Sequence, residues 1–374
     1  MTVKGWCPGA YTPMMSGDGL IVRVRPRMGR LTQDQILGLC AVSVQNGNGI
    51  IDLTSRANLQ LRGVKDHAAA LDALLVLDLL DPTPEAEAKR NIVVAPLWSD
   101  ADLTHRLHNA ICARLHELPD LPAKIGIAID TGAQPVLQDT SADFRFERGA
   151  GDTLILRADG ASGGRAITEA TAMDALIELT TWCAKHITPQ ARRMAKIVRK
   201  APLPAAWTKA KPQSNRASLS PGMTPIGPAF GAPFGSMNAH DLAALVTDNG
   251  PDGLRVTPWR VFVLENAAAG DAHGFVTAPG DPLLRTHACP GAPACAAASV
   301  DTRAVAQALA GAHTDLHVSG CAKGCAHPKP AHTTLVGRDG AYDLVVHGHP
   351  WDQPRQRGLS ATDLLTLKAT PDAL

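Results

Sequence analysis

The alternation of apolar and polar positions predicts the same order of elements twice along the chain. Residues 32–49 carry the capping pattern and the apolar periodicity of a helix, and residues 50–61 form a β-rich run with a polar insert. Residues 238–250 then predict a shorter capped helix, and residues 254–264 repeat the strand pattern with its own polar insert. This repeated order indicates an internal duplication.

The parallel continues downstream of each of these units. Helical periodicity recurs at residues 99–115 and 299–310, and each helix is followed by a predicted strand, at 124–130 and 315–319. Each strand leads into a hairpin-like pair of strands. Because the repeat is far longer than the roughly 20 to 50 residues of a solenoid unit, we predict two related α+β halves rather than an array.

Composition excludes several classes of function. The 36 Lys and Arg residues nearly balance the 35 Asp and Glu residues, and aromatic residues make up only 4% of the chain. No strong positive charge is therefore available to attract nucleic acid or an anionic membrane.

The longest charge-free stretch, residues 217–238, is interrupted by prolines, and the first residues carry no apolar run of signal-peptide length. We expect a cytoplasmic protein with no nucleic-acid or membrane partner.

Four of the eight cysteines form two spaced pairs in the second half. Cys289 and Cys295 have the spacing C-x5-C, and Cys321 and Cys325 have the spacing C-x3-C. Glycines and prolines fill both loops, which lets the backbone approach a bulky metal centre. Structural zinc sites usually use pairs separated by two to four residues, so the wider pair favours a [4Fe–4S] cluster over zinc. Four unrelated buried thiols are the alternative.

These motifs resemble those of the sulfite and nitrite reductase superfamily over nearly the whole chain. The cysteine loops at 287–295 and 319–328 are similar to its cluster signature. Three further stretches are similar to its anion-binding motifs: 53–60, 90–92 and 121–124. The resemblance implies that the last cysteine, Cys325, binds the cluster and, where sirohaem is present, bridges to its iron.

The resemblance also implies the domain organisation. The fold class is α+β, with two ferredoxin-like half-domains and two larger α/β domains in an internally duplicated sulfite/nitrite reductase-like fold. A basic run and then a Gly/Pro-rich stretch separate the halves and predict a linker. The predicted segments are half-domain 1 (1–80), the first reductase-type domain without a cluster (81–190), the linker (191–235), half-domain 2 (236–275) and the cluster domain (276–374).

A narrower resemblance points to the oxygen-using members of the superfamily that act in aerobic cobalamin synthesis. It rests on four stretches: 7–19, 123–126, 254–260 and 319–328. It implies a monooxygenase that uses O2 to hydroxylate precorrin-3A at C20 and to close a γ-lactone, with NADH as the ultimate electron donor. No glycine-rich fingerprint stands between a predicted strand and helix, so we expect a separate reductase or ferredoxin to deliver the electrons.

Five basic residues are candidates for binding a carboxylate-rich tetrapyrrole. Arg23 and Arg25 lie two apart in a predicted strand, so both project from one face, where they could bind carboxylates or lie on a solvated face. Arg56, Arg90 and Lys124 lie within or beside β-like runs and fall in the three anion-binding motifs. The resemblance places these three on the substrate or anion side of the site.

Other assignments stay open on the sequence alone. A sirohaem-dependent nitrite or sulfite reductase would use the same basic residues to bind its anion, although Gly126 stands where sulfite reductases carry a second lysine. The narrower resemblance allows a mononuclear non-haem iron, but no spacing of two histidines and a carboxylate identifies its ligands. His287 and His327 are interpreted as hydrogen-bonding neighbours of the cluster. A non-catalytic protein with a structural zinc ion is the third hypothesis.

Overall fold

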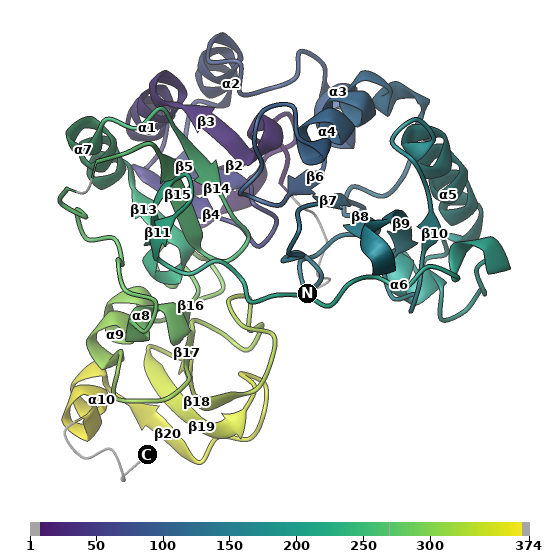
Figure 1. The fold of residues 1–374 in the computed structure, drawn as a ribbon. Helices are drawn as coiled ribbons and strands as arrows, with labels where there is room; N and C mark the ends of the chain where they lie inside the picture. The colour runs from purple at the N-terminus through teal and green to yellow at the C-terminus, as the bar shows by residue number, and fades with distance from the viewer. Residues whose placement is uncertain (1–7, 269, 369–374) are drawn as a thin grey trace.

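The computed structural model describes residues 8–268 and 270–368, so Cys7, the first residue of the 7–19 motif, lies outside the described residues. Four five-stranded sheets and the helices packed on them make up the fold (Figure 1). None of the helices in the described ranges combines the length and apolar composition that a membrane crossing requires.

The first half-domain is a mixed layer of one sheet and two helices. Its strands, in sheet order, are β1 (Met14–Ser16), β2 (Gly19–Val24), β5 (Leu59–Val64), β4 (Ile50–Leu53) and β13 (Ser236–Asn238). Val22 and Val24 point into the core under helices α1 (Gln33–Asn46) and α2 (His67–Val76). Because side chains alternate along a strand, Arg23 projects from the opposite face.

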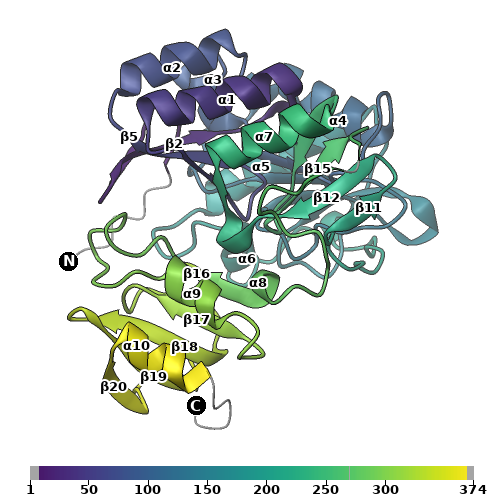
Figure 2. The ribbon, with the colours of Figure 1, turned by 90° about the vertical axis from the view of Figure 1, so that its left-hand side faces the viewer.

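The second half-domain repeats this order of strands. Its sheet contains β11 (Gly222–Thr224), β12 (Gly227–Gly231), β15 (Val261–Glu265), β14 (Gly253–Val256) and β3 (Arg30–Thr32). Helix α7 (Ala239–Asn249) packs beside α1 (Figure 2). The predicted duplication is therefore confirmed.

The two half-domains exchange their last strands. Strand β3 belongs to the first half of the chain but pairs with β14, with Leu31 opposite Leu254. Strand β13 belongs to the second half but pairs with β4, with Met237 opposite Ile51. All four of these side chains are buried in one common core, so neither half-domain closes its sheet alone.

The predicted linker at 191–235 needs correction. Its last part forms β11 and β12, so the second half-domain begins before residue 236. Its first part contains α6 (Met194–Ile197), which is buried against the domain that precedes it. The glycines that suggested a flexible linker reflect close packing instead: a Cβ at Gly227 would lie 2.0 Å from the carbonyl oxygen of Leu264.

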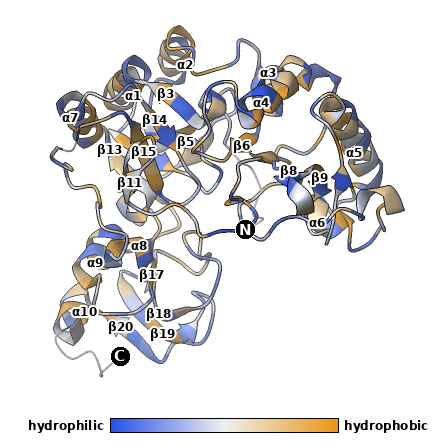
Figure 3. Ribbon diagram, in the orientation of Figure 1, coloured by the Kyte–Doolittle hydropathy of each residue, from blue (hydrophilic) through white to orange (hydrophobic). Residues whose placement is uncertain are grey.

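The first α/β domain has three parallel strands followed by two antiparallel ones. Its strands are β6 (Ile92–Val94), β7 (Ile127–Asp130), β8 (Phe144–Arg148), β9 (Leu154–Ala158) and β10 (Arg165–Ala166). Its main helices are α3 (Pro84–Lys89), α4 (Leu103–Ala113) and α5 (Ala172–His186). Hydrophilic residues within β8 and β9 (Figure 3) include the buried ion pair of Glu147 with Arg157.

The second α/β domain, which carries the four clustered cysteines, has the same strand order and a small core of its own. Its strands are β16 (Thr286–Ala288), β17 (Leu316–Ser319), β18 (Ala331–Arg338), β19 (Ala341–Gly348) and β20 (Gln356–Leu359). Its helices are α8 (Pro282–Arg285), α9 (Arg303–Leu309) and α10 (Ala361–Lys368). Helices α9 and α10 pack together on one side of the sheet (Figure 2).

The capping box of α1 offers a test of how the exchanged strand joins its helix. The Thr32 hydroxyl accepts from the Gln35 backbone N–H, and the Gln35 side chain accepts from the Thr32 backbone N–H. We expect Thr32→Ala to lower the free energy of unfolding by about 1 kcal/mol in urea denaturation. Thr32→Ser, which keeps the hydroxyl, should match the wild type, and an unchanged midpoint for Thr32→Ala would contradict the role of the cap.

Candidate active site

A cavity of about 930 Å³ lies where the two half-domains meet the cysteine-bearing domain. Its walls come from the open face of the first sheet, the turn between β14 and β15, and the loops around the cysteines. The charged residues that line it are Arg23, Asp52, Arg56, Arg62, Lys124, Arg260 and Arg303. Six basic side chains thus face one carboxylate, and the cavity suits a polyanionic ligand.

The polar face of the first sheet forms one wall of the cavity. Arg23, Gln60 and Asp52 lie opposite one another on adjacent strands, so the three side chains make a row across the sheet. Arg23 is only 7% exposed. The alternation of buried valines with Arg23 along β2 is the sequence pattern that predicts this side chain on the face opposite the core.

Asp52 connects this wall to the cysteine-bearing domain. Its carboxylate accepts hydrogen bonds from Arg62 Nη1 at 3.3 Å and from Arg303 Nη2 at 3.1 Å. Arg62 is further fixed by Asp18, and Arg303 by the hydroxyl of Ser236. The shared carboxylate therefore orients two guanidinium groups at the cavity wall.

Arg56 joins the cavity to the first α/β domain. It donates hydrogen bonds to the carbonyl oxygen of Lys124 at 3.0 Å and to the Ser141 hydroxyl at 3.2 Å. The exposed Lys124 side chain lines the same cavity. The structure thus brings together three of the five basic residues that the sequence proposed.

Arg260, the last residue of the 254–260 motif, also lines the cavity, although it was not among the five basic residues proposed from the sequence. It has a left-handed backbone conformation, with φ of 61°, in the turn between β14 and β15. Its guanidinium donates to the carbonyl oxygens of Thr286 and Leu284, and burial lowers its pKa. No carboxylate among the described residues lies within ion-pair distance of it, so an anionic ligand would supply the missing counter-charge.

Arg25 and Arg90 are not at the cavity, which corrects their predicted role in substrate binding. Arg25 Nη1 pairs with Glu87 Oε1 at 2.8 Å, and Arg90 pairs with both Glu87 and Asp81. Burial opposes the charge of Asp81, yet hydrogen bonds from Arg90 hold the pKa of Asp81 below its ordinary value. These arginines therefore neutralise buried carboxylates of the chain itself.

The four cysteines converge at the edge of the cavity, which Cys289 and Cys325 line directly. Burial raises the pKa of the Cys325 thiol, and charge repulsion from Cys321, Cys289 and Cys295 raises it further. The backbone N–H of Gly320 donates to Cys289 Sγ at 3.2 Å, as expected around a thiolate ligand.

The spacing of these sulfurs separates the metal hypotheses. Sulfurs on one tetrahedral zinc ion lie about 3.8 Å apart, given Zn–S bonds of about 2.3 Å. In the described part of the chain, no three of these cysteines have sulfurs that all lie within 4.8 Å of one another. As placed, the four cysteines are therefore more widely spread than the ligands of a compact tetrahedral zinc ion.

Two histidines and an aspartate also meet beside the cavity. His287 lines the cavity, and its side chain, Asp315 and His327 bring their ligand atoms within 4.8 Å of one another. Burial and the charge of Arg260 lower the pKa of His287 to about 3, so its imidazole is neutral at pH 7. The sequence marked both histidines but missed Asp315, because only the pairing of β16 with β17 brings it near them.

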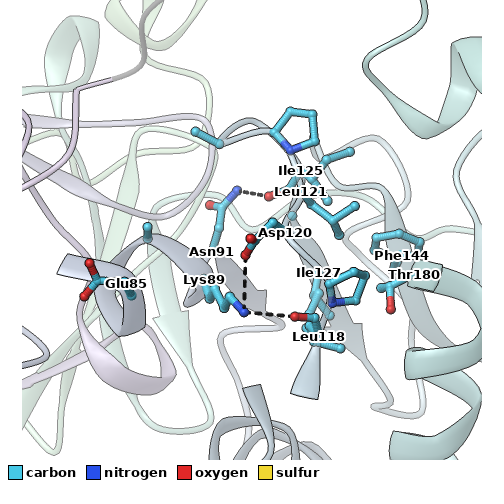
Figure 4. Close-up of a pocket in the computed structure, with 15 residues that line it drawn as sticks. Glu85, Lys89, Asn91, Leu118, Asp120, Leu121, Ile125, Ile127, Phe144 and Thr180 are labelled. Atoms are coloured by element: carbon cyan, nitrogen blue, oxygen red, sulfur yellow. Dashed lines mark hydrogen bonds and ion pairs between the residues drawn. The ribbon is translucent and has the colours of Figure 1, made fainter. Parts of the chain in front are cut away.

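A second, largely apolar pocket of about 250 Å³ lies in the first α/β domain (Figure 4). Lys89 there donates to the carbonyl oxygen of Leu118 and lies 3.7 Å from Asp120. Gly126 lines this pocket and not the large cavity, and a Cβ there would lie 2.9 Å from Asn91 Nδ2. The backbone of Gly126 therefore borders the smaller pocket, whereas Lys124, two residues earlier, lines the large cavity.

Comparisons with known proteins agree with this architecture. Residues 12–76 match the family model for the nitrite/sulfite reductase ferredoxin-like half domain. The fold is similar to that of the Mycobacterium tuberculosis NirA protein, with a TM-score of 0.66 and 17% identity, over 93% of this chain and 79% of that chain. The fold is therefore of the nitrite/sulfite reductase class.

A closer relationship is found with a precorrin-3B synthase from a Sinorhizobium species. The two are 32% identical over 92% of this chain and 83% of the relative. The chain belongs to the precorrin-3B synthase family. This confirms the narrower resemblance inferred from the motifs.

Replacing one of the converging cysteines tests whether they hold a common metal centre. We expect Cys321→Ser to lower the bound iron and acid-labile sulfide per chain by several-fold after anaerobic purification. Cys112→Ser removes a half-buried thiol of α4 that lies away from the cavity and should leave both values unchanged. Equal iron and sulfide in the two variants would contradict a shared centre.

Proposed function

We propose that this chain catalyses the O2-dependent hydroxylation of precorrin-3A at C20, with formation of a γ-lactone, in cobalamin biosynthesis. Membership of the precorrin-3B synthase family supports this proposal. The observation that carries it is a cavity of about 930 Å³ with six basic side chains, directly beside the converging cysteines. Its volume lies at the upper end of the range of about 300 to 1,000 Å³ for ligand pockets, as a tetrapyrrole requires.

The basic residues bind and orient the substrate. Precorrin-3A carries several peripheral carboxylates, and guanidinium groups can bind such groups with two parallel hydrogen bonds. Arg23 would engage carboxylates over the sheet, and Arg260 would do so from the opposite half-domain. A macrocycle bound at several points has one fixed orientation, so the same edge always faces the reacting centre. The binding energy is thereby used to hold the reacting atoms in position.

The metal centre would be a [4Fe–4S] cluster held by Cys289, Cys295, Cys321 and Cys325. When bound, such a cluster supplies one-electron transfer. Hydroxylation places one oxygen atom of O2 in the product and releases the other as water, so two electrons must enter from outside. A separate reductase or ferredoxin, supplied ultimately by NADH, would deliver them.

A sirohaem-dependent nitrite or sulfite reductase is the second candidate. The observation that favours it is that Cys325 lines the cavity, where its sulfur could bridge a cluster to a haem iron. The same basic residues would then bind the haem carboxylates and the small anion.

Pigment extraction separates the two functions. Anaerobically purified protein is extracted with acid–acetone, and the extract is identified by absorption and mass spectrometry. We expect iron and sulfide without sirohaem, followed by O2-dependent conversion of precorrin-3A when reductant is supplied. Stoichiometric sirohaem would contradict the synthase and establish the reductase.

Removing one cavity charge tests the role of the basic residues. Lys124 is exposed, so Lys124→Gln should fold normally yet raise the KM for precorrin-3A about tenfold, as expected for a lost charge-assisted contact of about 1.5 kcal/mol. Lys185→Gln, which changes an exposed lysine of α5 far from the cavity, is the matched control. An unchanged KM for Lys124→Gln would remove this lysine from the binding site.

A further inference from the structure

A cavity of about 600 Å³ lies beside the large cavity, between the first α/β domain and the second half-domain. It is lined by the loops that follow β6 and β7 and by residues 216–220. Its charged lining residues are only Asp102 and Arg216. Among the described residues, Trp259 alone lines both this cavity and the large one. Trp259 therefore lies between a strongly basic cavity and a much less charged one.

A hydrogen-bonded turn between β14 and β15 holds Trp259 in this position. Its backbone N–H donates to the hydroxyl oxygen of Thr257 at 3.3 Å, and that hydroxyl donates to the carbonyl oxygen of Val261. Thr257 is fully buried. The next residue, Arg260, is anchored to two carbonyl oxygens of the cysteine-bearing domain. Hydrogen bonds therefore fix the chain on both sides of Trp259.

The first half-domain has the same turn with a different side chain. There the backbone N–H of Arg56 donates to the Thr54 hydroxyl oxygen at 3.4 Å. The next residue, Ala57, has a left-handed conformation with φ of 53°, as Arg260 does with φ of 61°. Arg56 and Trp259 thus occupy equivalent positions, and both line the large cavity. One turn offers the cavity a guanidinium group, and the other offers an aromatic ring.

The phenyl and indole rings that line the large cavity, those of Phe234 and Trp259, both come from the second half of the chain. Phe234 packs against the core of the cysteine-bearing domain. Trp259 is only partly buried, and it packs against the core that the two half-domains share. The polar row that includes Arg23 comes instead from the first sheet. The cavity therefore offers cations for the rim of a flat ligand and an aromatic ring for its face.

We propose that Trp259 is a positioning residue for the tetrapyrrole: its indole lies against one face of the macrocycle and closes the large cavity toward the second one. This role rests on the proposed function, which supplies the macrocycle. Contact between two flat π systems adds to the gain from burying their apolar surface. Because the turn is fixed, the indole also limits how far the macrocycle can move toward the second cavity, and so keeps its reacting edge in place.

Anaerobic binding tests this role without turnover. The Kd for precorrin-3A is measured by equilibrium dialysis of the full chain in the absence of O2. We expect Trp259→Ala to raise the Kd about tenfold, whereas Trp259→Phe, which keeps a flat ring, should bind nearly as tightly as the wild type. Trp182→Ala is the matched control, because the Trp182 ring stacks on His186 of α5 and lines neither cavity.

The fate of O2 during turnover gives a second readout. When the macrocycle is misplaced, two electrons and two protons reduce O2 to hydrogen peroxide, and no oxygen atom enters the product. We expect Trp259→Leu, which keeps an apolar side chain without a flat ring, to raise the ratio of peroxide to product several-fold, and Trp259→Phe to leave that ratio unchanged.

The outcomes separate this role from the proposed function. A wild-type Kd in both Trp259→Ala and Trp259→Leu would overturn the role of the indole alone. The same conclusion would follow if Trp259→Phe lost as much affinity as Trp259→Ala, because a flat ring would then not be what the ligand requires. A wild type that does not bind precorrin-3A would overturn the proposed function and this role with it.

Discussion

The exchange of β3 and β13 between the two half-domain sheets is the constraint on which the rest of the structure depends. Each sheet obtains its fifth strand from the other half of the chain, and the exchanged strands lead directly into the adjacent helices α1 and α7. This reciprocal pairing fixes the equivalent turns after β4 and β14 at one cavity. Arg56 and Arg260, from these two turns, thereby face a common ligand although they come from different halves.

Each half-domain sheet also has an ion pair between equivalent positions of two adjacent strands, but the acidic and basic residues are interchanged between the two sheets. The first sheet has Asp52 on β4 and Arg62 on β5, whereas the second has Arg255 on β14 and Glu265 on β15. Each pair contacts a neighbouring α/β domain: Asp52 accepts from Arg303, and Arg255 donates to backbone carbonyls of the first α/β domain. The reversal lets two similar sheets select different partners, because a pair with the wrong sign would leave a buried charge uncompensated.

The sequence predicted what depends on local pattern, and missed what depends on distant partners. Capping signals and strand alternation predicted the duplicated elements, and the spacing of the cysteines predicted a shared centre, which the convergence of the thiols supports. The position of the Arg25 side chain could not be predicted from local pattern, because its buried ion-pair partner, Glu87, is distant in the sequence. The same holds for Asp315, which only the register of two parallel strands brings to His287. Gly-rich strands such as β12 resembled a linker because close packing and flexibility favour the same residue.

The separate core of the cysteine-bearing domain has a consequence for access to the cavity. The hydrogen bonds across this boundary are polar contacts that water could replace. Arg303 donates to the Asp52 carboxylate, and the Gly17 backbone N–H donates to the carbonyl oxygen of Ala294. Arg260 donates to the carbonyl oxygens of Thr286 and Leu284. Phe234 adds an apolar contact. A small rotation of this domain would exchange those hydrogen bonds for water and would uncover little apolar surface beyond the contact of Phe234. A bulky macrocycle could thus enter and leave through a hydrated seam, at far less cost than unpacking either core.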